Sequence, residues 1–246
     1  MFERLGAMGQ QWQGKKWYCY GTSMTDNRIR NGGFSGTTPE RQPSQPRKTG
    51  YYSGFLAEFA GLEEHNFGKG GSGIIPAIHG EDSIKSRVMR LDDGKAEADL
   101  ITVEVIANDL RLDDARSKLG EITDWSDDTF CGNLNQMLAY LMENTKAVVA
   151  VLIATRSRYA PRDVDNRNHP TGEKALTRLL WEESVEKICR IHGVSFWNGA
   201  AEANLGYFRM GMSMKYAQDQ IHLTEKGGRI LAQYYWGKLQ MLYPIK

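Results

Sequence analysis

The chain has 246 residues, of which 41% are hydrophobic and 25% are charged. This composition is typical of a soluble globular protein that can bury a sizeable core. Lys and Arg number 31 against 30 Asp and Glu, a formal charge of only +1, so the charge balance predicts neither a nucleic-acid partner nor a membrane-surface partner.

The N-terminal segment has no apolar stretch of the kind found in a secretory signal. No apolar run approaches the roughly 20 residues that a membrane-spanning helix needs. The default expectation is therefore a bacterial-type cytoplasmic protein. The sequence leaves open non-classical export, membership of a larger particle and formation of a homo-oligomer.

The three cysteines, Cys19, Cys131 and Cys189, are odd in number and widely spaced, which argues against a disulfide framework and against a zinc site. Cys19 and Cys189 lie in apolar periodic segments and are expected to be buried thiols. Four histidines are scattered along the chain and predict no zinc cluster; they are His65, His79, His169 and His192.

The first third of the chain predicts a strand, a helix and a second strand, in that order. WYCY at 17–20 is β-favouring, and a short strand is expected near 62–67. Residues 26–50 lack periodicity and are expected to form a long loop. The segment 51–61 is expected to be a helix that stops at Gly61, with one apolar face made of Tyr51, Phe55, Leu56 and Phe59.

The alternation of strands and helices continues to the C-terminus. Strands are predicted at 99–106, 146–155 and 193–198, and helices at 129–144, 172–191 and 224–242. Such an alternation requires a parallel sheet with helices on both faces. With no internal repeat or linker, residues 1–246 are expected to form a single domain.

Polar residues follow the predicted strands, where parallel α/β sheets place their reactive groups. Ser23 lies in GTSMTD after the first strand, and NFGKGG follows the second. Asn108-Asp109 follows the third strand, and the segment DQIH, which contains Asp219 and His222, precedes the last helix.

These residue types suit acyl transfer. A serine hydroxyl attacks a carbonyl only when a base removes its proton, and histidine is the best base near neutral pH. A carboxylate three residues before the histidine can orient its ring. Backbone N–H groups and an asparagine amide can stabilise the oxyanion that forms.

The four segments resemble the sequence blocks of the SGNH (GDSL-like) hydrolases, in the same order. GTSMTD resembles the GDS block, NFGKGG the glycine block, IAND the GxND block and DQIH the DxxH block. The resemblance extends over 21–222. It implies a flavodoxin-like three-layer α/β/α sandwich with a five-stranded parallel sheet, and an esterase that needs neither cofactor nor metal.

The resemblance also implies roles for individual residues. Ser23 would be the nucleophile, His222 the general base and Asp219 the residue that orients His222. The oxyanion hole would consist of the N–H groups of Ser23 and Gly71 and the side chain of Asn108. The chain departs from the family pattern at two positions, where Thr22 replaces the Asp of GDS and Ile106 replaces the glycine of GxND.

The expected substrate is a small-molecule or carbohydrate ester with a short acyl group, most simply acetyl. The polar and arginine-rich loop at 26–50 favours a polar acylated ligand. A lipase or thioesterase, and a catalytically silent carbohydrate-binding module on the same scaffold, stay open as alternatives. GKGGSG at 68–73 also fits a dinucleotide-binding pattern, but Pro76 argues against a helix directly after it.

Overall fold

The computed structural model describes residues 10–26, 52–90, 94–110, 117–154, 173–205, 216 and 222–244, with the side chains of Gln10 and 173–176 left out. Its centre is a parallel sheet of five strands in the order β2-β1-β3-β4-β5. The strands are β1 (Lys16–Gly21), β2 (Glu63–Gly68), β3 (Leu100–Glu104), β4 (Val148–Ile153) and β5 (Ser195–Asn198). All five were predicted from the sequence, and their order is that of a flavodoxin-like sheet.

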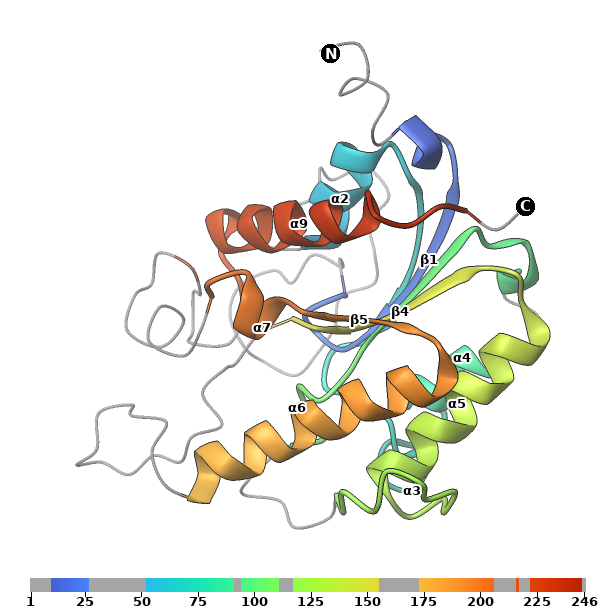
Figure 1. Ribbon diagram of the computed structural model, residues 1–246, viewed down its shortest axis with the longest axis vertical. Coiled ribbons are helices and arrows are strands. Elements are labelled where there is room, and N and C mark those ends of the chain that lie inside the picture. Colours follow the sequence, from blue (N-terminus) through green and yellow to red (C-terminus); the bar gives the residue numbers. More distant parts are fainter. Residues whose placement is uncertain are drawn as a thin grey trace.

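Helices cover both faces of the sheet (Figure 1). One face carries α2 (Tyr52–Ala60) and α9 (Glu225–Leu239), and the other carries α4 (Ile84–Val88), α5 (Phe130–Asn144) and α6 (Glu173–His192). Two short helices, α3 (Pro76–His79) and α7 (Gly199–Glu202), lie in the connections, as do 3-10 turns at Gln10–Trp12, Gly80–Asp82 and Lys95–Glu97. The three-layer α/β/α sandwich is therefore confirmed.

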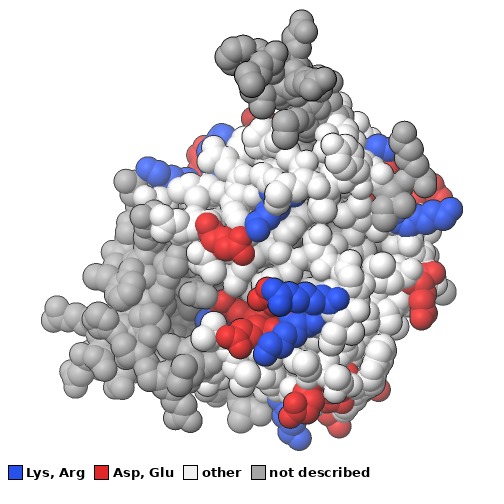
Figure 2. Space-filling view, viewed as in Figure 1, with Lys and Arg blue, Asp and Glu red and all other residues white. Residues whose placement is uncertain are grey.

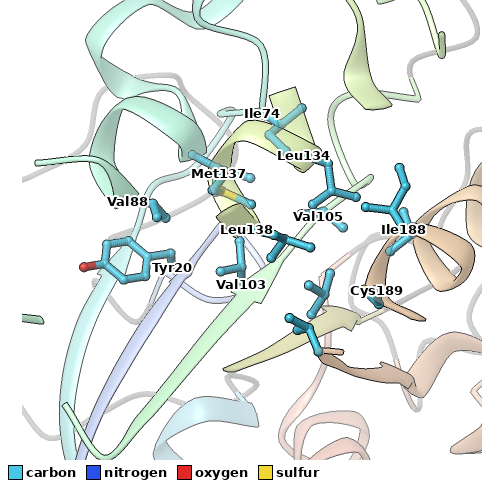
Figure 3. Packing of buried hydrophobic residues seen from close by; sticks show 14 of the residues in the cluster. Tyr20, Ile74, Val88, Val103, Val105, Leu134, Met137, Leu138, Ile188 and Cys189 are labelled. Carbon is cyan, nitrogen blue, oxygen red and sulfur yellow. The ribbon is translucent and has the colours of Figure 1, made fainter. Parts of the chain in front are cut away.

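Alternate residues along each strand supply the two halves of the core, because successive strand side chains point to opposite faces. Ile101 and Val103 of β3 belong to the cluster under α5 and α6, whereas Leu100 belongs to the cluster under α2 and α9. Figure 3 shows Val103 with Leu138 of α5 and Ile188 of α6 in the first cluster. All three cysteines are buried thiols, and the burial of Cys19 and Cys189 was expected.

Two sequence expectations need correction. The buried face of α2 consists of Tyr52, Ser53, Leu56, Ala57 and Ala60, so Phe55 and Phe59 lie at its margin. Small residues on this face allow α2 to pack closely against its neighbours. A prediction based on large apolar residues alone does not identify this face. In addition, a helix does begin at Pro76, because proline is well tolerated at the first helical position, where its missing N–H would have no helical partner.

Acidic and basic side chains adjoin one another on the face shown in Figure 2, in keeping with the near-zero formal charge. Among the described helices, none is long and apolar enough to cross a membrane. Three features that the sequence analysis named lie outside the described residues: Tyr51, the segment 27–50 and His169.

Candidate active site

Ser23 lies in a tight turn immediately after β1. Thr22 O accepts hydrogen bonds from Thr25 N at 3.1 Å and from Asp26 N at 2.9 Å, which closes the turn around Ser23. Thr22 Oγ1 accepts a further bond from Met24 N at 3.2 Å. The residues around it are buried, whereas Ser23 is partly exposed. The turn therefore presents the Ser23 hydroxyl at the carboxyl end of the sheet.

His222 reaches this turn from the start of α9. Leu223, the next residue, is buried in the core, and Thr224 caps the helix by accepting a bond from Gly227 N at 3.3 Å. This anchoring brings His222 Nε2 to 2.9 Å from Ser23 Oγ. A neutral imidazole that carries its proton on Nδ1 has a free lone pair on Nε2, and Nε2 can accept the serine proton. The contact is the one that general-base activation of a serine requires.

Gly71 lies in the loop between β2 and α3, beside the Ser23 turn. Lys69 N donates to Gly21 O at 3.0 Å, and Ser72 Oγ donates to Lys69 O at 2.8 Å. Gly71 has a φ of +81°, and a Cβ at this position would meet no atom within 4 Å. The glycine is thus required by backbone conformation rather than by lack of space.

Asn108 follows β3 in a turn that begins at Ile106. The amide Nδ2 of Asn108 donates to Ser72 O at 2.8 Å, which ties this turn to the Gly71 loop. Ile106 is fully buried with a φ of +78°, so it adopts the conformation that glycine favours. The isoleucine therefore keeps a glycine-like turn at the cost of backbone strain, since β-branched residues rarely occupy this region.

Asp109 joins the same two loops from within the core. Its Oδ1 accepts from Ile74 N at 2.5 Å, and its Oδ2 accepts from Ile106 N at 3.2 Å. Burial raises the pKa of Asp109 to about 6, although these backbone hydrogen bonds act in the opposite direction.

Arg87 of α4 forms a third connection beneath the site. Its guanidinium donates to Gly21 O at 2.9 Å, to Ser72 Oγ at 2.8 Å and to Phe67 O. These acceptors lie at the end of β1, in the Gly71 loop and near the end of β2. A single buried side chain thus holds together the segments before Ser23 and around Gly71.

The arrangement leaves hydrogen-bond donors available beside the serine. In the described part of the chain, the N–H groups of Ser23 and Gly71 donate to no acceptor. Asn108 Nδ2 carries two hydrogens and uses one on Ser72 O. Donors of this kind can stabilise an oxyanion at a reacting carbonyl.

Glu104, at the end of β3, is a site residue that the sequence motifs missed. It is fully buried, and its Oε2 accepts from Thr22 N and from Thr22 Oγ1, both at 2.7 Å, and from Thr25 Oγ1 at 3.4 Å. Burial raises its pKa to about 7. The available signal was a charged residue inside the mostly apolar run LITVEVI.

The structure brings Ser23 and His222 into contact and links Asn108 to the Gly71 loop. Asp219 lies outside the described residues, so its expected role stays a prediction. Within the described segments, no group of three or more His, Cys, Asp or Glu side chains could hold a metal ion.

Comparisons with known proteins give structural matches at low sequence identity. Neither a protein-family model nor a curated protein matches the chain. A protein from Lactobacillus plantarum shares 20% identity with a TM-score of 0.68, covering 94% of this chain and 99% of its own.

Two further structures carry a stated activity. An α/β hydrolase enzyme from the metagenome of Lake Arreo, Spain, is 16% identical with a TM-score of 0.58, covering 93% of this chain and 96% of its own. A catalytic mutant of an acetylxylan esterase from Geobacillus stearothermophilus is 15% identical with a TM-score of 0.56, covering 94% and 95%. The chain therefore has a fold that is also found in hydrolases, including an esterase.

Proposed function

We propose that the protein is a serine esterase of the SGNH type that hydrolyses short acyl esters, with acetyl as the simplest acyl group. The observation that carries the proposal is the 2.9 Å contact between Ser23 Oγ and His222 Nε2, two atoms from residues 199 positions apart. A serine and a histidine in hydrogen-bond contact at the carboxyl edge of a parallel sheet form the core of an acyl-transfer site. The fold shared with an acetylxylan esterase supports the same reaction class.

In the proposed mechanism, Ser23 Oγ attacks the ester carbonyl while His222 Nε2 takes the hydroxyl proton. The oxyanion accepts hydrogen bonds from Ser23 N, Gly71 N and the Asn108 amide. His222 then passes its proton to the leaving alkoxide, and an acyl-enzyme remains on Ser23. A water molecule, deprotonated by His222, attacks the acyl-enzyme, and Ser23 regains its proton as the acid leaves. Asp219 is expected to orient His222 throughout.

A carbohydrate ester is the proposed substrate class. The sequence places several arginines in the loop directly after Ser23, which favours a polar alcohol component over a long lipid chain. The acetylxylan esterase among the structural matches acts on an acetylated carbohydrate. No metal or organic cofactor takes part in the proposed steps.

Labelling with a fluorophosphonate tests the nucleophile directly. The reagent should modify wild-type protein at Ser23, as located by peptide mass. It should not modify Ser23→Ala, and it should modify His222→Ala much more slowly than wild type. Ser126→Ala, which changes an exposed serine outside the site, serves as the matched control. Absence of labelling in folded wild-type protein would refute the proposal. Carbohydrate binding that survives in Ser23→Ala, with no wild-type turnover, would support the binding-module alternative.

A series of p-nitrophenyl esters tests the acyl group. Hydrolysis of the acetate should be much faster than that of the palmitate if the site accepts short acyl chains. The reverse order would favour the lipase or thioesterase alternative. Release of acetate from an acetylated xylooligosaccharide, compared with a neutral acetyl ester of a simple alcohol, tests whether the sugar contributes to recognition.

A further inference from the structure

Glu104 lies directly under the turn that presents Ser23. Leu100, Thr102 and Glu104 alternate along β3 and share the sheet face covered by α2 and α9. Leu100 is part of the apolar cluster on that face, yet Glu104 places a carboxyl group in the same layer with no exposure to solvent. Burying a carboxyl group destabilises the folded state unless hydrogen bonds compensate for the loss of hydration.

The hydrogen bonds of this carboxyl group go to the nucleophile turn. Oε2 accepts from both the backbone and the hydroxyl of Thr22, and Thr25 Oγ1 lies 3.4 Å away. Oε1 has no hydrogen-bond partner among the described residues. The hydrogen bonds of this side chain therefore go to residues that flank Ser23.

These bonds restrain the neighbours of Ser23 and leave Ser23 itself available. Thr22, held by Glu104, accepts bonds from Met24 N, Thr25 N and Asp26 N. Rotation of the Thr22 peptide would therefore displace the Ser23 N–H group and hydroxyl together. Glu104 thus supports the turn that presents Ser23 from the neighbouring strand.

The same contact explains why Thr22 departs from the GDS pattern. An aspartate at position 22 would bring a second carboxylate next to Glu104 in a buried place, where two like charges repel strongly. Threonine instead supplies a hydroxyl that donates to Glu104 and accepts from Met24.

We propose that Glu104 is a positioning residue for Ser23, which fixes the direction of the Ser23 N–H group and hydroxyl by accepting the two hydrogen bonds of Thr22. This inference rests on the proposed esterase function and adds a residue to it. Glu104 accepts its hydrogen bonds from Thr22 and Thr25, so it acts on Ser23 through these neighbours. Its removal should slow the chemical step and leave substrate binding nearly unchanged.

The experiment compares four variants by kcat and KM on p-nitrophenyl acetate, by rate of fluorophosphonate labelling and by melting temperature. Glu104→Leu removes the acceptor, whereas Glu104→Gln keeps one oxygen that can accept both Thr22 bonds. Thr22→Val keeps the backbone bond and removes the hydroxyl. Thr102→Val is the matched control. It removes a buried hydroxyl that accepts a 2.9 Å hydrogen bond from Trp17 Nε1 on the same face of β3, away from the Ser23 turn.

Glu104→Leu should lower kcat about 100-fold with KM changed by less than about threefold, and Glu104→Gln should recover most of the loss. Thr22→Val should lower kcat about tenfold, and Thr102→Val should lower the melting temperature with little change in kcat. If Glu104→Leu does not fold, the inference stands only if Thr22→Val lowers kcat at constant KM while Glu104→Gln retains activity.

Two results would overturn the inference. One is a folded Glu104→Leu variant with wild-type kcat, and the other is an equal loss of kcat in Glu104→Leu and Thr102→Val, which would indicate general destabilisation. Wild-type protein that is not labelled at Ser23 would instead overturn the esterase proposal. A labelled wild type with an unaffected Glu104→Leu variant would leave that proposal intact.

Discussion

Asp109 Oδ1 accepts a 2.5 Å hydrogen bond from Ile74 N, and this bond ties the turn after β3 to the loop after β2. Asn108 and Gly71 belong to these same two segments, and Asn108 Nδ2 donates to Ser72 O. The relative placement of Asn108 and Gly71 thus depends on the buried carboxyl group of Asp109, which follows Asn108 in the sequence.

Asp109→Asn should destabilise the protein and slow turnover. An asparagine can still accept from Ile74 N, but its NH₂ group would then face the Ile106 N–H, so two donors would meet. We expect the free energy of unfolding to fall by about 1–3 kcal/mol, measured by urea denaturation. Asp82→Asn, at an exposed carboxylate, is the control and should change it by less than about 0.5 kcal/mol. Equal stability of Asp109→Asn and wild type would contradict the prediction.

The stability of the protein should depend on pH through Glu104. Burial raises the pKa of Glu104 from 4.5 to about 7, so the folded state holds this proton more tightly than the unfolded state. The stabilising contribution is complete below pH 4.5 and disappears as the pH rises through about 7. Buried Asp109 should add a similar trend up to about pH 6.

The stability difference between wild type and Glu104→Gln isolates this contribution, because the other titrating groups largely cancel. Among the described residues, Asp109, Tyr52 and Tyr235 are titratable groups that interact electrostatically with Glu104. Between pH 4 and pH 8, the free energy of unfolding of wild type should fall by about 3 kcal/mol relative to that of Glu104→Gln. Chemical denaturation across this range checks the prediction, and a pH-independent difference would show that the pKa of Glu104 is not raised.

Ile106→Gly should be less destabilising than a glycine substitution at an equally buried isoleucine. Both Ile106 and Ile101 have no exposed surface, but Ile101 lies in β3 whereas Ile106 has a φ of +78°. Glycine relieves the strain only at position 106, so the two losses of stability should differ by about 1–3 kcal/mol. Thermal melting of the two variants measures this difference. An equal loss would mean that Ile106 stores no backbone strain.

Arg87→Met should loosen the support under the Ser23 turn and the Gly71 loop. The variant leaves Gly21 O and Ser72 Oγ without their guanidinium donor in a buried place. We expect a loss of roughly 2–4 kcal/mol in the free energy of unfolding. Arg90→Met is the control, because Arg90 is half exposed and donates to the exposed Glu81 O. The free energy of unfolding of this variant should stay close to that of wild type.

The sequence by itself determined the arrangement of strands and helices. All five strands and the helices α2, α5, α6 and α9 were predictable, because hydrophobic periodicity is a local property of the chain. The pairing of Ser23 with His222 was also predictable, since the carboxyl ends of parallel strands meet at one edge and the motifs follow a familiar order. Local pattern failed at the buried face of α2 and at Pro76, where packing and helix position decide the outcome.

Only the tertiary structure decided how the site is supported. In the sequence, Glu104 is a charged residue within a mostly apolar strand and has no evident role. The register between β1 and β3 places it under Thr22. The role of Arg87 depends on three acceptors from separate segments, and the role of Asp109 depends on Ile74, which lies 35 residues away in the sequence. Such relationships are non-local: a buried polar group is defined by the partners that folding brings to it, and residue spacing along the chain does not identify those partners.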